Sequence, residues 1–555
     1  MRFLRLAMAV TVGLSMFLSW LATAEARPGK LRLVQHFRSP DESVASFSAD
    51  GKLLIMGDNY LRLWNPKSGK EDARFTFTFG KPSTFTFVPS PDGRTVVVSY
   101  YDKEKELRLF DVASGKEILR LPQPARAWWP EFAPDGTTLI VRGDGVRLWD
   151  VKTGKELWRL RLQLPEKSPL QLRERWETSH RLAFSPDGKL LAVSLEDGSI
   201  HLCDMKTGVE VRRLFRAVRR FTPSHLAFSP DSGYLAANAD DKFKGFVIRL
   251  WDMHNGELVR SFSEPNPPLP DDLGSMVERQ AAIMKDPLRA RERYFADCHS
   301  QGSDGLAFSP DGKTLVNACF WTQLWEVATG RIRHEFDAYT YQVCFSPVEP
   351  LLAASCWGDD PKDPKGPATR EGIFLWNWRD PCLKQPARLD PQDIERLWRD
   401  LASPDAPVGY RTIATLLAHP RRAVAALGDR LRRVEPVAPG ELEHLTANLD
   451  DETFSVREKA VARLAALGEA SRPTLLRVKA QSPSLEVRRR IEDLLARLAQ
   501  PAGGPESLRC LRAVEVLETI DTEEARRVLV KLASGADRAL QTEDAKAALK
   551  RLKRR

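Results

Sequence analysis

The first 380 residues repeat one pattern of apolar and polar positions. In its clearest copy, residues 183–210, two runs of alternating apolar residues meet at Ser185-Pro186-Asp187-Gly188, and the second run ends before Lys206-Thr207-Gly208. Alternation with a period of two indicates half-buried strands. Both short stretches have turn composition, because Pro presets φ and Gly accepts φ > 0. The pattern therefore predicts a small antiparallel meander.

Both halves of this unit recur seven times along the chain. The first turn recurs at Asp50, Asp92, Asp135, Asp187, Asp231 and Asp311, with a degenerate copy at Ser346-Pro347-Val348-Glu349. The second half is Leu-Trp-Asp or a variant, ending at Asn65, Asp111, Asp150, Asp204, Asp252, Glu326 and Asn377. Two motifs repeating together in this way resemble the WD40-repeat family. The resemblance implies a seven-bladed β-propeller of four-stranded blades over residues 27–385.

The two ends of this region are predicted to meet. Residues 31–37 alternate apolar and polar side chains but precede the first repeat and have no blade of their own. The seventh repeat has Pro381 and Pro386 where its outer strand should be, and Pro cannot donate to a ladder. We expect residues 31–37 to complete blade seven, which closes the ring and removes an exposed sheet edge.

Strand direction divides the loops between two faces of the ring. Turns between the first and second and between the third and fourth strands of a blade lie at one end, called here the short-turn face. The opposite end is called the long-loop face, and it receives every long insertion: residues 100–106, 161–180, 240–246, 261–304 and 357–371. We expect this face to hold partners.

Five residues near these insertions are candidate contacts. Exposed aromatic and Arg side chains dominate binding hot spots. The candidates are Trp128, Trp129, Arg173, Arg175 and Trp176. An equal alternative is that Trp128 or Trp129 plugs the propeller channel.

From about Asp390 the apolar period changes from 2 to 3.6, which indicates helices, beginning with a stripe that includes Leu397 and Leu401. The pair Val456-Arg457 recurs 31 residues later as Val487-Arg488, and Glu524-Ala525-Arg526 is a weaker third copy. These copies resemble HEAT-type repeats, in which helix pairs stack into a solenoid. The resemblance implies a helical HEAT-like domain over residues 390–500 and a further helical repeat with a basic C-terminal end over residues 505–555. A plain helical bundle is the alternative.

One helix start is predicted in detail. Ser455 followed by Glu458 has the spacing of a capping box, in which a hydroxyl and a carboxylate satisfy amide donors.

The N-terminus has the form of a secretory signal. Arg2 and Arg5 precede a charge-free run to Leu21, and small residues suited to cleavage follow within residues 22–26. We therefore expect residues 1–26 to be a signal peptide and the protein to be periplasmic, in the cell envelope or extracellular. An uncleaved membrane anchor is the alternative.

The net charge of +9 is concentrated at the other end of the chain. Residues 546–555 carry six basic residues and no acid, so the body of the protein is nearly neutral. Nucleic acid is therefore not expected as a partner. The basic end would suit an anionic polymer or lipid surface, although a solvated helix end is the more ordinary interpretation.

No catalytic, metal-ligating or phosphate-binding motif has usable spacing in the chain. We therefore predict no enzyme activity, catalytic residue, cofactor or metal. The cysteines number seven, an odd count, and Cys203, Cys319, Cys344 and Cys356 lie in apolar strand patterns. We expect them to be buried thiols without a disulfide.

An enzyme alternative starts from residues 149–158, which are similar to the tryptophan-docking motif of quinoprotein dehydrogenase propellers. In that family the final Trp recurs in every blade, whereas the positions matched to Trp158 are Leu119 in blade two and Val259 in blade five. Only blade three fits. The sequence therefore favours a non-enzymatic scaffold that binds protein partners on the long-loop face and the helical repeats. A quinoprotein-like enzyme and a binder of anionic polymer through the tail are the alternatives.

Overall fold

The computed structural model describes residues 31–553 with gaps, the largest of which are residues 76–84, 161–180, 215–224, 264–304 and 358–371. The expected signal peptide and most of the long insertions therefore lie outside the described residues. Within the described residues, no helix is long and apolar enough to cross a membrane.

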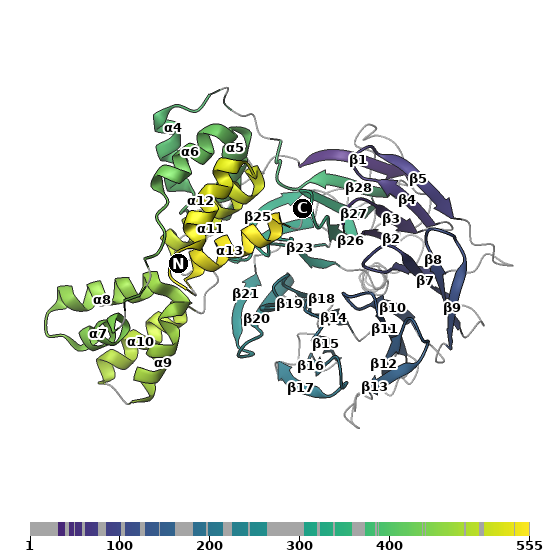
Figure 1. The fold of residues 1–555 in the computed structure, drawn as a ribbon, viewed down its shortest axis with the longest axis horizontal. Coiled ribbons are helices and arrows are strands. Elements are labelled where there is room, and N and C mark those ends of the chain that lie inside the picture. The colour runs from purple at the N-terminus through teal and green to yellow at the C-terminus, as the bar shows by residue number, and fades with distance from the viewer. Residues whose placement is uncertain are drawn as a thin grey trace, which may run out of the picture.

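A seven-bladed β-propeller forms the first part of the protein, as predicted (Figure 1). Each blade is a four-stranded antiparallel sheet. Blade one contains β2 (Val44–Phe47), β3 (Leu54–Gly57), β4 (Leu61–Asn65) and β5 (Lys70–Phe75). Blade two contains β6 (Phe85–Pro89), β7 (Thr95–Tyr100), β8 (Glu106–Asp111) and β9 (Glu117–Pro122). Blade three contains β10 (Trp128–Phe132), β11 (Thr138–Gly143), β12 (Gly145–Asp150) and β13 (Glu156–Leu160).

Blades four to six follow the same order. Blade four contains β14 (Leu182–Phe184), β15 (Leu190–Ser194), β16 (Ile200–Asp204) and β17 (Glu210–Leu214). Blade five contains β18 (His225–Phe228), β19 (Tyr234–Asp241), β20 (Gly245–Asp252) and β21 (Leu258–Ser263). Blade six contains β22 (Leu306–Phe308), β23 (Thr314–Asn317), β24 (Thr322–Glu326) and β25 (Arg331–Phe336).

Blade seven is built from both ends of the propeller chain. It contains β26 (Tyr339–Phe345), β27 (Leu351–Trp357) and β28 (Gly372–Asn377), and β1 (Arg32–Arg38) is its outer strand. β1 pairs antiparallel with β28, from Arg32 opposite Asn377 to Arg38 opposite Gly372. The Phe37 side chain is only 2% exposed and packs in a cluster that also contains Phe47 of blade one. One strand thus joins the first and last blades.

The repeated turn owes its shape to its own side chains. In blade four, the Ser185 hydroxyl donates to the Asp187 carboxylate at 2.6 Å and accepts from the backbone N–H of Leu190. Gly188 has φ +72°, which only Gly adopts without strain. The same Ser–Asp bond occurs at Ser48, Ser90, Ser229 and Ser309. Local chemistry therefore fixes the short-turn face of most blades.

Helices make up the rest of the described chain: α4 (Pro391–Asp400), α5 (Ala406–Ala418), α6 (Pro420–Arg430), α7 (Glu441–Ala447), α8 (Phe454–Leu467), α9 (Arg472–Ala480), α10 (Leu485–Leu498), α11 (Pro505–Ile520), α12 (Glu523–Ala533) and α13 (Leu540–Leu552), with short 3-10 turns at Asn448–Asp450 and Gly468–Ala470.

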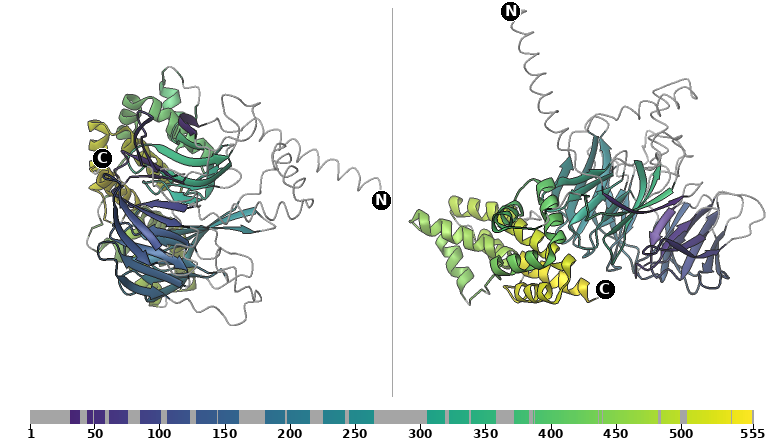
Figure 2. Two further views of the ribbon diagram at one scale, coloured as in Figure 1. Left: turned by 90° about the vertical axis from the view of Figure 1, so that its right-hand side faces the viewer. Right: turned by 90° about the horizontal axis from the view of Figure 1, so that it is seen from above.

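These helices form two clusters. α4–α6 share one apolar core with α11–α13, and we call these six helices the bundle. α7–α10 have a separate core and form a lobe that projects away from the propeller, as Figure 2 also shows. Val434, Leu467 and Ala539 belong to the seam between the two cores. The lobe therefore interrupts the bundle in sequence but stands apart from it in space.

This division into a bundle and a lobe differs from the unbroken array of stacked helix pairs that the sequence copies imply. The two good sequence copies lie in α8 and α10, which contact each other in the lobe. The third copy lies in α12, which packs in the bundle instead. The predicted capping box is wrong, because Ser455 lies inside α8 and its N-cap, Thr453, makes no side-chain bond. A capping box forms at α4 instead, between Asp390 and Asp393.

Replacing Phe37 by Ala tests the closure. Loss of a buried aromatic ring should destabilise the protein by about 3–5 kcal/mol, measured by chemical denaturation. Val34→Ala in the same strand is the control, because Val34 is 43% exposed and should cost far less. Equal effects of the two substitutions would contradict a closing role for β1.

Candidate partner-binding site

The five candidate residues on the long-loop face remain a prediction. Trp128 opens β10 and pairs with Arg142, and Trp129 follows it in the strand. Their side chains lie outside the described part of the structure, as do Arg173, Arg175 and Trp176 entirely.

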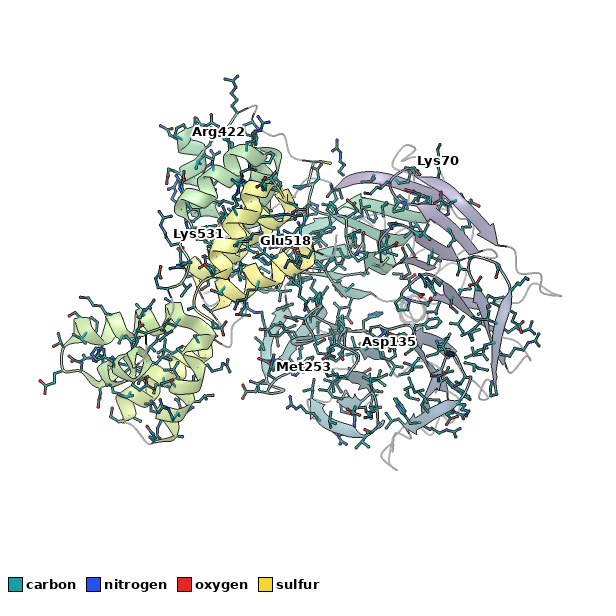
Figure 3. All side chains as sticks on the ribbon, viewed as in Figure 1. Lys70, Asp135, Met253, Arg422, Glu518 and Lys531 are labelled. Atoms are coloured by element: carbon teal, nitrogen blue, oxygen red, sulfur yellow. The ribbon has the colours of Figure 1, made fainter. Side chains whose placement is uncertain are left out.

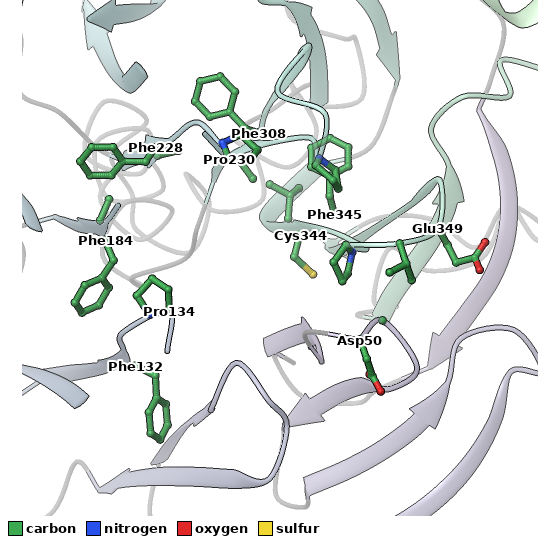
Figure 4. A pocket seen from close by; sticks show the side chains of 18 of the residues that line it. Asp50, Phe132, Pro134, Phe184, Phe228, Pro230, Phe308, Cys344, Phe345 and Glu349 are labelled. Atoms are coloured by element: carbon green, nitrogen blue, oxygen red, sulfur yellow. The ribbon is translucent and has the colours of Figure 1, made fainter. Parts of the chain in front are cut away.

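A cavity of about 1160 Å³ opens at the centre of the ring on the short-turn face (Figure 4). Its wall is formed by the innermost strands of the blades, and the aromatic residues before the repeated turn line much of it: Phe132, Phe184, Phe228, Phe308 and Phe345. The cavity is as large as sites that hold small ligands.

The rim of this cavity has two unlike halves. Pro134, Pro230 and Pro310 supply the rim from blades three, five and six. On the side of blades one and seven the rim is charged, with Lys67 paired to Glu349 at 2.7 Å. Arg551 of α13 also lines the cavity, so the rim includes the C-terminal helix. The mouth therefore combines surfaces from both parts of the chain.

The bundle covers the outer strand of blade six. In the outer strand of each blade, one residue forms a bulge opposite the third strand. In blades two to four these residues are Ile118, Leu157 and Val211, which are 52%, 51% and 57% exposed. The bulge residue of blade six is Arg333, which is only 1% exposed. Its burial marks the surface on which the bundle sits.

Arg333 belongs to a buried cluster of four charges. Its guanidinium donates to Glu326 of β24 at 2.9 Å and to both carboxylate oxygens of Glu515 of α11 at 2.9 and 3.0 Å. Arg512 of α11 also donates to both oxygens of Glu326, at 2.7 and 2.9 Å. All four side chains are 1% exposed or less. The two positive and two negative charges balance within the interface.

The neighbouring helix makes room for this cluster. A Cβ on Gly409 of α5 would lie 2.2 Å from the Arg512 guanidinium carbon, closer than any side chain tolerates. Arg512 also donates to the carbonyl oxygens of Leu401 and Ser403. Its charge and donors are thus satisfied by the propeller and the bundle together.

A second set of ion pairs lies beside the short-turn face. Lys313, next to the repeated turn of blade six, donates to Asp544 of α13 at 2.7 Å and to the carbonyl of Leu511 at 2.8 Å. Asp311 pairs with Arg379 at 2.7 Å, and its side chain is 3% exposed. The equivalent Asp50 of blade one is 56% exposed. The bundle therefore covers one repeated turn as well as one outer strand.

Arg551 on the cavity rim is held by the same region. It donates to both oxygens of Glu518, a fully buried residue of α11, at 2.7 and 2.8 Å. Glu518 lies where the bundle meets the propeller (Figure 3). The position of the rim residue thus depends on how the bundle docks.

The pKa values follow from these contacts. Burial opposes ionisation of Glu326, yet Arg333 and Arg512 hold the pKa of its carboxyl well below the usual value. Burial likewise opposes ionisation of Asp311, but Arg379 and Lys313 lower its pKa. For Asp544 burial outweighs the attraction of Lys313, so its pKa is raised. The Glu326 carboxylate therefore stabilises the docked form as an anion, because Arg512 belongs to the bundle.

The sequence analysis missed this cluster, although two signals were present. Glu326 replaces the Asp or Asn found at this position in the other six repeats. Like Asp111, Asp150 and Asp204, Glu326 accepts from a turn hydroxyl, here that of Thr329 at 2.8 Å. Its longer side chain also reaches two guanidiniums. Arg512 and Glu515 are charged residues within an apolar stretch of α11. Only the docked structure shows which charges meet.

The residues compared with the tryptophan-docking motif have a structural role. Trp158 reaches the next blade, where its Nε1 donates to the Met205 carbonyl at 2.8 Å. In blade five Arg260 pairs with Leu250, just as Trp158 pairs with Leu148 in blade three. The residue equivalent to Trp158 is therefore Arg260, and the predicted match to Val259 is wrong. Arg260 also donates to the next blade, at the Thr329 carbonyl. The contact between neighbouring blades thus explains why a Trp stands at position 158.

The described residues contain no group of three His, Cys, Asp or Glu side chains placed to hold a metal ion. Cys203, Cys382 and Cys510 are free thiols, and burial raises the pKa of Cys203 to about 11. Cys319 and the Cys356 side chain lie outside the described residues. In the basic tail, Lys546 pairs with Asp537 and Glu543, which leaves less charge for an anionic polymer.

Substitutions at Glu326 test the ion cluster. Glu326→Gln leaves two buried guanidiniums with one carboxylate and should lower the free energy of unfolding by about 3–5 kcal/mol, measured by urea denaturation. Asp150→Asn is the matched control, because Asp150 occupies the same position in blade three and bonds only to its own turn. Equal losses in both variants would show that the cross-domain pairs contribute nothing.

Comparisons with known proteins support a WD40 repeat domain. Residues 133–219 match the family model described as anaphase-promoting complex subunit 4 WD40 domain. WD repeat-containing protein SL1-17 of Schistosoma mansoni is 26% identical over 165 residues, which cover 28% of this chain and 46% of that protein. WD repeat and SOCS box-containing protein 1 of Homo sapiens is 31% identical over 109 residues, covering 20% and 22%.

A third relative is the U3 small nucleolar RNA-associated protein 15 homolog of Xenopus tropicalis, which is 25% identical over 193 residues, covering 32% of this chain and 36% of that protein. The chain thus spans less than half the length of these relatives. Among solved structures, the Cps50 (Swd1) β-propeller domain of Myceliophteria thermophila aligns with a TM-score of 0.43 and 15% identity, covering 62% of this chain and 99% of that chain. WD40 propellers of this kind are typically protein-interaction scaffolds.

Proposed function

We propose that this protein is a non-enzymatic scaffold, exported from the cytoplasm, that holds protein partners on the long-loop face of its propeller and on its helices. The observation that carries this proposal is the buried cluster of Glu326, Arg333, Arg512 and Glu515, which joins propeller and bundle. A scaffold must present separate surfaces in a fixed relation. Buried, fully paired charges give such a relation because any other docking would leave a charge unpaired.

The placement of the bundle favours the long-loop face as the partner surface. The described contacts of the bundle with the propeller involve the outer strand of blade six and residues at the short-turn face, including Lys313 and Glu326. The short-turn face is thus partly occupied within the chain. Trp128, Trp129, Arg173, Arg175 and Trp176 remain the candidate contacts on the other face.

The lobe supplies a second candidate surface. Phe454 at the start of α8 and Leu485 at the start of α10 are 65% and 83% exposed. The two starts are neighbours, because Ser484, just before α10, donates to Asp450, just before α8, at 3.0 Å. Large exposed apolar side chains in adjacent positions are typical of protein contacts. This pair is the strongest feature of the helices for binding.

Affinity capture with the full-length protein tests both surfaces. Removing the helices is unsuitable because it would expose Arg333 and His334, which the bundle buries. Instead, Trp176→Ala and Leu485→Glu should each weaken the capture of at least one specific partner by about 10-fold or more, as expected for hot-spot residues. Val530→Glu, on an exposed part of α12, is the control. Retention of every specific partner by both variants would reject these surfaces.

Export is tested separately. Cell fractionation should find the protein outside the cytoplasm, with a mature N-terminus close to Arg27, read by mass spectrometry. A cytoplasmic protein that retains Met1 would overturn export without affecting the scaffold proposal.

A further inference from the structure

The outer strand of a blade is a surface on which this chain already packs helices. On blade six, α5 contacts β25, and the bulge residue Arg333 donates to Glu515 of α11. Blade three has Leu157 at the same bulge position, and this side chain is more than half exposed. Blade three thus leaves open a surface of the kind that blade six covers with helices.

The outer edge of blade three, residues 147–159, is basic as well as apolar. It contains four basic residues and two acidic ones: Arg147, Lys152, Lys155, Arg159, Asp150 and Glu156. Glu156 pairs with two Arg side chains, while Lys155 is exposed and forms no salt bridge with any residue that the structure describes. The corresponding stretches of blades two and four, which also have an apolar bulge residue, contain three basic residues and two acidic ones. Of these three blades, blade three therefore has the greatest excess of positive charge.

The lobe has the opposite combination at the starts of α8 and α10. Phe454 and Leu485 are the most exposed apolar side chains among its described residues. Segments 450–454 and 484–487 contain four acids and no basic residue: Asp450, Asp451, Glu452 and Glu486. Basic residues begin one turn later in each helix, at Arg457 and Arg488. We call these two segments the lobe tip, and its acids and apolar side chains complement the outer edge of blade three.

These two surfaces cannot meet within one chain. The lobe projects from the bundle on one side of the molecule, and β13 of blade three lies across the ring from the bundle (Figure 1). The paired charges that hold the bundle on blade six fix this separation. A contact between the lobe tip and blade three therefore requires two copies of the chain.

We propose that the lobe tip binds a second copy of this protein, whose blade three receives Phe454 and Leu485 beside its own Leu157. This inference rests on the proposed role of the lobe as a binding surface and names one partner for that surface. In the contact, the acids of the lobe tip face the excess positive charge of the blade edge, and the apolar side chains of both copies leave water.

The proposed contact joins two unlike surfaces, so a dimer leaves both kinds of surface open. One copy still presents a free blade three, and the other still presents a free lobe tip. Further copies can therefore add until a ring closes. We expect association to continue beyond the dimer as the concentration rises.

Analytical ultracentrifugation of the full-length protein over a range of concentrations tests this contact. The wild type should form dimers and larger species as its concentration approaches about 100 μM, which is sufficient for a weak specific contact. Leu157→Ser and Leu485→Ser should each weaken association by about 10-fold, because each removes an apolar side chain from the contact without changing the charge. Added salt should weaken association of the wild type, because it screens the facing charges.

A mixture of the two Ser variants tests whether the two surfaces bind each other. The Leu157→Ser copy keeps its lobe tip, and the Leu485→Ser copy keeps its blade three. An equal mixture should therefore form heterodimers with the wild-type affinity, but no larger species. Val34→Ser is the matched control, because Val34 occupies the bulge position of blade seven, where Arg32 already pairs with Asp380. This control should associate as the wild type does.

Three results would each overturn the proposal: a wild type that stays monomeric, association that both Ser variants leave unchanged, or a mixture without heterodimers. The scaffold proposal is judged separately, by the capture experiment. If the protein does not self-associate but Leu485→Glu loses another partner, the lobe remains a binding surface and the second copy is excluded as its partner.

Discussion

The docked arrangement depends on the pairing of four buried charges. Glu326 and Arg333 come from blade six, Arg512 and Glu515 come from α11, and none has appreciable contact with solvent. Burying a charge without a partner is costly, so each side of the interface requires the other. Replacing a buried ion pair by apolar residues of similar volume is often neutral or stabilising, whereas removing one partner is costly. Specific geometry, more than strength, is what such an interface provides.

A single blade has been altered to receive the bundle. The ordinary repeat ends its third strand in Asp or Asn and places an apolar residue at the bulge in blades two to four. Blade six has Glu326 and Arg333 at these positions. Both changes lengthen or charge a side chain at the surface without disturbing the four-stranded sheet. A repeat architecture thus acquires one docking point by two substitutions, and Glu326 still accepts from the hydroxyl of its own turn.

This docking has consequences for the surfaces that remain. The bundle covers part of the short-turn face, and its Arg551 lines the central cavity. The lobe, in contrast, projects away and exposes Phe454 and Leu485. The propeller and the lobe are therefore held at a distance by a bundle whose position is set by charge pairs. The arrangement suits a protein that presents two surfaces together.

The sequence by itself determined the blades and their turns, because period-two alternation and Ser-Pro-Asp-Gly chemistry act over a few residues and need no distant partner. It also indicated helices from residue 390 onward. It failed at Ser455, which lies two positions after the actual N-cap, Thr453. It also failed at Val259, because the strand register makes Arg260 the residue equivalent to Trp158. Only the tertiary structure decided that α12 leaves the repeat, that α5 and α11 dock on β25, and that residues 186 positions apart, Glu326 and Arg512, form one ion pair. Such pairings depend on how whole surfaces meet, which no local pattern encodes.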